Sequence, residues 1–117
     1  MPANDKPVLI YATFPGEEEA ARIGSALVEA RLAACVNILG SIRSIYVWQD
    51  RRQEGTETAM LIKTVASLAE AVMERVRAMH SYDTPALLVL PVEGGSADFL
   101  AWIAAQTGPL PGPAAQA

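Results

Sequence analysis

Runs of apolar residues alternate along the chain with segments in which apolar side chains recur at helical spacing. The first kind is typical of strands in a sheet, and the second of helices with one buried face. From this pattern we predict strands over residues 8–14, 35–49, 57–64 and 86–92, and helices over residues 17–32, 67–79 and 97–107. Gly40 and Ser41 indicate a bulge or a short break within the second strand, and the polar segment 50–55 indicates a hairpin tip.

The order of these elements predicts one fold class. Two right-handed β-α-β connections joined by a hairpin give an antiparallel four-stranded sheet with both helices on one face. This α+β arrangement is the ferredoxin-like βαββαβ plait, here with an extended hairpin between the second and third strands and a C-terminal helix. The plait supports many unrelated functions, so the fold class alone predicts none of them.

The expected boundaries come from residues that favour helix ends and chain breaks. Ser67 begins a Ser-x-x-Glu capping box at the start of the second helix. Ser96 is positioned to cap the third helix, and Gly108 to end it. Residues 1–107 have a length that suits a single domain. The segment 108–117 is rich in proline and glycine and has no periodicity, so we predict that it is disordered.

Composition and charge exclude several classes of protein. Apolar residues make up 51% of the chain and charged residues 19%, which is enough for a sizeable core. The nine basic residues are scattered and the net charge is −4, so we expect no nucleic-acid partner. No apolar run is long enough to span a membrane, and the N-terminal region lacks the pattern of a signal peptide. With a single cysteine as well, we expect a soluble cytoplasmic protein without a membrane partner.

The polar bend between the second helix and the fourth strand is the strongest candidate for a functional site. It contains His80, the only histidine, followed closely by Tyr82 and Asp83. Polar bends at such junctions often hold ligands, and histidine is the side chain that most readily changes protonation near neutral pH. Two interpretations of His80 stay open: a helix-end residue that bonds a carbonyl or faces the helix dipole, or a ligand-binding residue.

Soft metal ligands are scarce in this sequence. Cys35 lies in an apolar run, so we expect a buried side chain that reacts slowly with thiol reagents. One histidine and one cysteine fall short of the four ligands that zinc prefers. Neither a Cys-x-x-Cys motif nor a glycine-rich phosphate loop occurs.

Four residues of the central strands have a structural interpretation and a functional one. Lys63 either extends along a sheet edge or pairs with a carboxylate in a cleft. Glu57 begins the same strand and is either a solvated strand end or part of that cleft. Tyr46 and Trp48 lie on the long hairpin, where we expect them to pack against another subunit.

Several short motifs between Val8 and Ile103 occur in a characteristic order. They read L-A-A-C-V-N-I at 32–38, S-I-Y-V-W at 44–48, E at 57 with L-I-K-T at 61–64, H-S-Y-D-T-P at 80–85, L-P-V at 90–92 and L-A-W-I at 100–103. In order and spacing they closely resemble the CutA family, the divalent-cation tolerance proteins. The resemblance implies a ferredoxin-like subunit, a tight trimer similar to the PII signalling proteins, and a link to tolerance of copper and other divalent ions.

The polar bend departs from the family's usual pattern, His-Pro-Tyr-Glu-x-Pro-Glu. Ser81 replaces the first proline, and Asp83 and Ala86 stand in place of the two glutamates. Some relatives carry a cysteine late in the first strand and a second histidine before the motif, and the matching positions here are Ala12 and Met79. Only the histidine of the bend remains from that ligand set, so we expect divalent metal to bind weakly and mainly through this residue.

We therefore expect a homotrimeric binding or regulatory protein rather than an enzyme. Clefts between its subunits would hold copper or zinc through His80 and Asp83. A small ligand would be bound there by a second set of residues: Glu57, Lys63, Tyr82 and Trp48. One alternative is a small acid–base enzyme that uses His80 with a carboxylate, although no nucleophile–base–orienter arrangement is present. The other is a purely structural trimer.

Overall fold

The computed structural model describes residues 5–110, and its elements follow the predicted order. The strands are β1 (Pro7–Phe14), β2 (Cys35–Trp48), β3 (Arg51–Val65) and β4 (Leu87–Pro91). The helices are α1 (Glu17–Glu29), α2 (Ala69–Met79) and α3 (Ala97–Ala105), and a short 3₁₀ turn, η1 (Ala66–Leu68), precedes α2. Most of the segment that we predict to be disordered, residues 111–117, lies outside the described residues.

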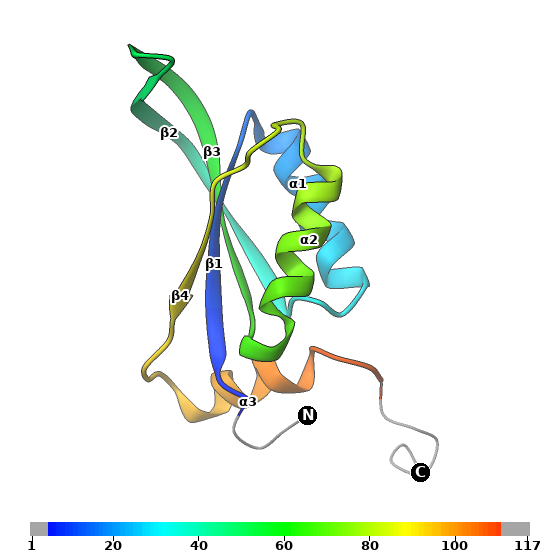
Figure 1. The fold of residues 1–117 in the computed structure, drawn as a ribbon. Helices are drawn as coiled ribbons and strands as arrows, with labels where there is room; N and C mark the ends of the chain where they lie inside the picture. The colour runs from blue at the N-terminus through cyan, green and yellow to red at the C-terminus, as the bar shows by residue number, and fades with distance from the viewer. Residues whose placement is uncertain (1–4, 111–117) are drawn as a thin grey trace, which may run out of the picture.

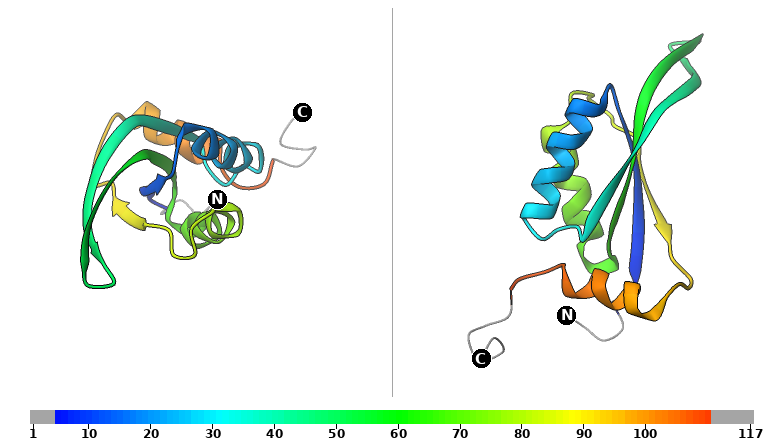
Figure 2. Two further views of the ribbon diagram at one scale, coloured as in Figure 1. Left: turned by 90° about the horizontal axis from the view of Figure 1, so that it is seen from above. Right: turned by 180° about the vertical axis from the view of Figure 1, so that it is seen from behind.

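The four strands form one antiparallel sheet in the order β2-β3-β1-β4 (Figure 1). α1 and α2 lie side by side on one face of the sheet, and α3 lies across its lower end (Figure 2). This is the predicted ferredoxin-like plait. The described helices leave most of the other sheet face uncovered, and none of them is long and apolar enough to cross a membrane.

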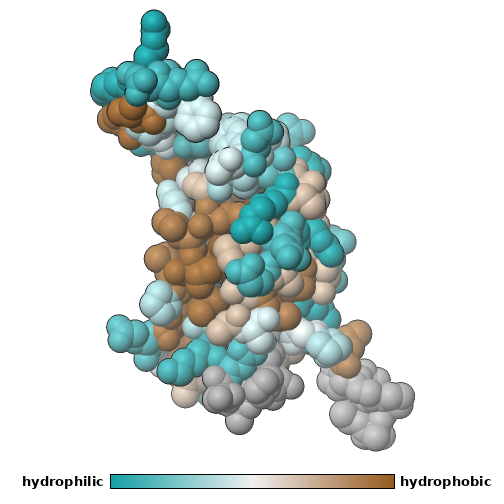
Figure 3. Space-filling view, in the orientation of Figure 1, coloured by the Kyte–Doolittle hydropathy of each residue, from teal (hydrophilic) through white to brown (hydrophobic). Residues whose placement is uncertain are grey.

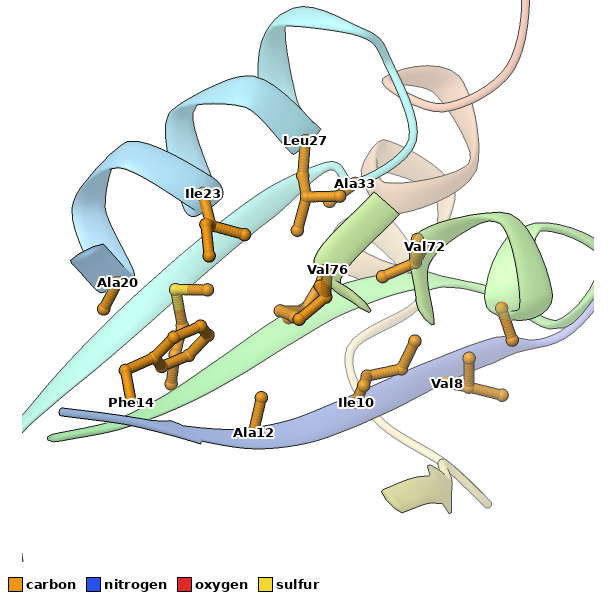
Figure 4. Close-up of a cluster of buried hydrophobic side chains, with 13 residues drawn as sticks. Val8, Ile10, Ala12, Phe14, Ala20, Ile23, Leu27, Ala33, Val72 and Val76 are labelled. Carbon is orange, nitrogen blue, oxygen red and sulfur yellow. The ribbon is translucent and has the colours of Figure 1, made fainter. Parts of the chain in front are cut away.

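The core lies between the sheet and the two long helices. Ile10 of β1 belongs to the same buried cluster as Ile23 of α1 and Val76 of α2 (Figure 4). Burial of each such side chain stabilises the fold by about 1.5–3 kcal/mol. Gly24 lets α1 approach the sheet closely, because a Cβ atom at this position would lie 2.8 Å from Cγ2 of Val36.

The β2–β3 hairpin is longer than the rest of the sheet. Its turn consists of Gln49 and Asp50, whose φ angles of 52° and 63° are typical of a two-residue type I′ turn. The prediction of a polar tip over 50–55 is wrong, because this tight turn lets β3 begin at Arg51. The pairing of β1 with β3 ends at Thr58, so residues 51–57 pair with β2 alone.

The bulge that Gly40 indicates is confirmed, because the β2–β3 register shifts between Leu39 and Ser41. After this shift the even-numbered residues of β2 share a sheet face with the odd-numbered residues of β3. Tyr46 and Trp48 therefore lie on the same face as Glu57, which is the face that α1 and α2 leave uncovered.

Two predicted helix ends are corrected by long-range contacts. α1 ends at Glu29 rather than at residue 32, because Arg31 adopts a φ of 60° and turns the chain back toward the sheet. Nε of Arg31 donates to the Gly108 carbonyl at 2.7 Å, and Nη2 donates to the Ala105 carbonyl at 2.9 Å. α3 accordingly ends at Ala105, before the predicted end at residue 107.

The predicted capping box at Ser67 is wrong, whereas the cap at Ser96 is confirmed. α2 begins at Ala69 without a side-chain cap. The backbone N–H of Ser67 donates instead to the Asp5 carboxylate at 3.0 Å, and the Ser67 hydroxyl donates to the same group. At α3, the Ser96 hydroxyl accepts a hydrogen bond from the N–H of Phe99 at 3.4 Å.

Candidate functional site

His80 lies at the end of α2, where its side chain is fully buried. Nε2 lies 2.8 Å from the carbonyl oxygen of Thr13 at the end of β1. Nδ1 accepts a hydrogen bond from the backbone N–H of Tyr82 at 3.0 Å. A carbonyl can only accept and a backbone N–H can only donate, so these partners assign the neutral tautomer with the proton on Nε2.

The rings around His80 leave it little freedom. The Phe14 ring stacks on it with centroids 4.9 Å apart, and the Tyr82 ring lies 4.7 Å away at an interplanar angle of 45°. His80 thus fixes the polar bend to the end of β1. Of the two interpretations of His80, its contacts in a single chain match that of a helix-end residue that bonds a carbonyl.

Glu19 of α1 holds the same bend from the other side. Its Oε2 accepts hydrogen bonds from the backbone N–H and the hydroxyl of Ser81, both at 3.0 Å, and lies 3.4 Å from Nδ1 of His80. Burial raises the pKa of Glu19, but the two hydrogen bonds from Ser81 and the positive charge of Arg22 outweigh it, and His80 adds to the lowering only when its ring is protonated. The net pKa is below the ordinary value of 4.5.

A tight metal centre does not fit the residues of one chain. Both ring nitrogens of His80 already have protein partners, so a metal ion would have to displace one of them. Within residues 5–110 no group of three or more His, Cys, Asp or Glu side chains is placed to hold a metal ion. The prediction of a metal site at His80 and Asp83 has no support in this geometry.

A groove on the uncovered sheet face gathers most of the predicted ligand-binding residues. It has a volume of about 470 Å³ and lies between the hairpin and the bend. Its lining residues are Thr13, Tyr46, Trp48, Glu57, Tyr82, Asp83, Thr84 and Ala86. Trp48, Glu57, Tyr82 and Asp83 thus come together in a groove of the single chain, whereas from the sequence we expect them in a cleft between subunits. Trp48 is 60% exposed and Tyr46 is 50% exposed in the single chain.

Tyr82 and Glu57 are joined across this groove. The Tyr82 hydroxyl donates to Oε2 of Glu57 at 3.0 Å. Burial of the phenol, together with the Glu57 carboxylate that accepts its proton, raises the pKa of Tyr82 to about 12. Tyr82 is therefore a neutral donor at physiological pH, and the negative charge of the pair stays on Glu57.

Lys63 and Cys35 lie outside the groove of the single chain. Lys63 is six residues from Glu57 on β3, a separation of roughly 20 Å along a strand, and it does not line the groove. Its Nζ lies 5.3 Å from the centroid of the Phe99 ring. Cys35 pairs with Lys63 in the sheet and is half-buried rather than buried in the single chain, because its side chain is on the uncovered face.

Four lining residues of the groove were not predicted as ligand-binding residues: Thr13, Tyr46, Thr84 and Ala86. The sequence predicts Tyr46 only as a residue that packs against another subunit. Thr84 and Ala86 line the groove because they are close in sequence to Tyr82 and Asp83. Thr13 could have been found from alternation along β1, since it lies on the opposite face from the buried Ile10 and Ala12.

The uncovered sheet face below the groove is apolar. Leu88 and Leu90 of β4 are 59% and 40% exposed, and Leu39 of β2 is exposed as well. In the register of the sheet, Leu9 and Tyr11 of β1 lie beside Leu90 and Leu88. Figure 3 shows apolar side chains gathered over the β4 side of the sheet.

Comparison with known proteins matches the chain to one family over most of its length. Residues 8–106 match the family model described as CutA1 divalent ion tolerance protein. The divalent-cation tolerance protein CutA of Pectobacterium atrosepticum is 42% identical over 104 residues, which cover 86% of this chain and 94% of that protein. The corresponding protein of Archaeoglobus fulgidus is 46% identical over 94 residues, covering 80% and 91%.

Solved structures agree with the sequence comparisons. The divalent cation tolerance protein (Cut A1) from Thermus thermophilus superposes with a TM-score of 0.85 at 41% identity, covering 87% of this chain and 99% of that one. The chain spans about half the length of the plant and animal relatives it matches, for example 54% of the rice protein.

Proposed function

The chain belongs to the CutA1 divalent ion tolerance family, and from this premise we propose that it is a trimeric binding protein. Its proposed role in divalent ion tolerance is to bind a small ligand in grooves that border the contacts between subunits. The groove lined by Trp48, Glu57 and Tyr82 is the proposed ligand site.

The observation that carries this proposal is the uncovered apolar sheet face. Exposed leucines at 39, 88 and 90 form a surface that soluble proteins usually cover with a partner. The groove lies on the same face, so a neighbouring subunit seated on the leucines would border the ligand site. The hairpin extends past the core of its own chain and would reach that neighbour.

The link to divalent ions does not require a tight metal centre in each chain. Copper or zinc would bind only weakly, because both ring nitrogens of His80 already have hydrogen-bond partners. Among the described residues, no third His, Cys, Asp or Glu side chain is placed to bind a metal ion together with Glu57 and Asp83. We propose no catalytic step. The alternative of an acid–base enzyme would need His80 to face a substrate, whereas its side chain is fully buried. The cytoplasmic location stays a prediction.

Light scattering of the purified protein tests the assembly. We expect three times the chain mass, and Leu90→Asp should shift the mass toward that of one chain. Val28→Asp is the matched control, because Val28 on α1 is equally exposed, at 39%, but lies on the opposite side of the sheet. A wild-type protein with the mass of a single chain would contradict the proposal.

A further inference from the structure

We propose that the groove between the hairpin and the polar bend binds a small organic ammonium ion. The rings of Tyr46, Trp48 and Tyr82 would surround the cation, and the Glu57 carboxylate would neutralise its charge. The proposal builds on the proposed function, since it names the ligand class for the same groove.

The aromatic rings are the first observation. Three of the eight residues that line the groove are aromatic, although aromatic residues make up only 6% of the chain. Tyr46 and Trp48 are well exposed in the single chain, so the rest of the described chain leaves them available to a ligand held at the edge of the subunit contact. The faces of such rings attract cations, and tryptophan does so most strongly.

The charge of the groove is the second observation. Its two ionisable carboxyl groups are Glu57 and Asp83, and none of the eight described lining residues is basic. Oε2 of Glu57 accepts the Tyr82 hydroxyl, and no described side chain forms an ion pair with this carboxylate. The groove therefore has a net negative charge and an acceptor that can take a ligand N–H.

Two of the hairpin arginines lie away from the groove. Arg43 and Arg52 form ion pairs with Glu54. By the register of the hairpin, these three residues lie on the face opposite Tyr46 and Glu57. Arg51 pairs with Trp48 beside the turn and therefore lies on the groove face, but it is not one of the lining residues.

These features favour an organic cation over an inorganic ion or a neutral ligand. An inorganic divalent ion needs several oxygen or nitrogen ligands, which the aromatic walls do not supply. A neutral ligand would take water away from Glu57 without compensating its charge. The bend that carries Tyr82 is also fixed in advance by the hydrogen bond to His80, which lowers the entropy lost on binding.

The test is a calorimetric titration of the full chain with choline and with 3,3-dimethylbutan-1-ol, its neutral isostere. We expect choline to bind about tenfold more tightly than the neutral alcohol. Glu57→Gln keeps an acceptor for Tyr82 but removes the charge, and it should weaken choline binding about tenfold. Trp48→Ala should weaken it by a similar factor. Glu93→Gln, an equal change of charge at an exposed site outside the groove, should leave it unchanged.

Two results would overturn the proposal: equal binding of choline and the neutral alcohol, or no binding of choline at about 100 mM. Choline binding that Glu57→Gln and Glu93→Gln weaken equally would overturn it too, since the attraction would then come from net charge alone. Light scattering on the same samples tests the trimer independently of the ammonium site. A monomer that binds choline contradicts only the trimer, and a trimer that does not bind choline contradicts only the ammonium site.

Discussion

Nε2 of His80 lies 2.8 Å from the carbonyl oxygen of Thr13, which joins the end of α2 to the end of β1 across 67 residues of sequence. The backbone of the bend is attached to the other ring nitrogen through Tyr82. A single imidazole therefore connects the core, the helix and one wall of the groove.

His80→Ala should destabilise the fold by about 2–4 kcal/mol, because it leaves a cavity beside Phe14 and removes the partner of the Thr13 carbonyl. Urea unfolding at a fixed protein concentration measures this change. Ser81→Ala, which removes one exposed hydrogen bond to Glu19, should lower the stability by about 1 kcal/mol or less. Equal losses in the two variants would contradict the structural role of His80.

Glu19 should make the fold sensitive to acid. Its pKa is below 4.5 in the folded protein, so its contribution is complete above that value and is lost as the pH falls through the folded pKa. Glu19→Gln can still accept hydrogen bonds from Ser81 but cannot be protonated in this range. Thermal melting as a function of pH should show a smaller drop below about pH 4.5 in the variant than in the wild type. Parallel curves would show that Glu19 does not contribute.

Tyr82 should ionise only near pH 12. A pKa raised from 10 means that the stabilising contribution of this residue is complete below pH 10 and falls as the pH rises toward 12. Ultraviolet titration measures tyrosinate absorbance, and the difference between the wild type and Tyr82→Phe gives the share that comes from Tyr82. Glu57→Gln should move that share to lower pH, since it removes the negative charge beside the phenol.

Titration with copper(II) or zinc distinguishes two expectations about the metal. The sequence predicts weak binding that depends on His80. The geometry predicts that His80→Ala leaves the weak binding unchanged, because the ring is buried and both nitrogens are engaged. Calorimetry of wild type and variant decides between them, with the folded state of the variant checked first by circular dichroism.

Cys35 should report on the assembly. Its side chain is half-buried in the single chain and lies on the uncovered sheet face, so a neighbouring subunit would cover it. We expect a thiol reagent to label the native wild type slowly and Leu90→Asp faster. The Val28→Asp variant is the control and should react like the wild type. Identical rates in all three proteins would show that this part of the face is not an interface.

The features that the sequence predicts correctly depend on local patterns. Alternation along β1 and β3 and the helical spacing of Val72 and Val76 determine the order of elements and hence the sheet topology. The same alternation, combined with the bulge at Gly40, places Trp48 and Glu57 on one face.

The errors arise where distant segments compete for the same groups. Ser67 would cap a helix in an isolated peptide, but Asp5, 62 residues away, binds its N–H and hydroxyl. The partners of His80 depend on where β1 ends, which no motif around residue 80 encodes. The distance between Lys63 and Glu57 follows from strand length, and it keeps Lys63 out of the groove of its own chain.

Because residues 51–57 pair with β2 alone, the upper hairpin is a two-stranded ribbon that carries one wall of the groove. Amide hydrogens in such a ribbon can exchange with solvent through local opening, whereas those beside Ile10 and Ile62 in the core exchange only when the whole domain unfolds. The two walls of the groove thus belong to regions whose amide hydrogens differ in their protection from exchange with solvent. A ligand that bridges Trp48 and Tyr82 would slow exchange in the hairpin far more than in the bend, and the deuterium pattern would show which wall is ordered on binding.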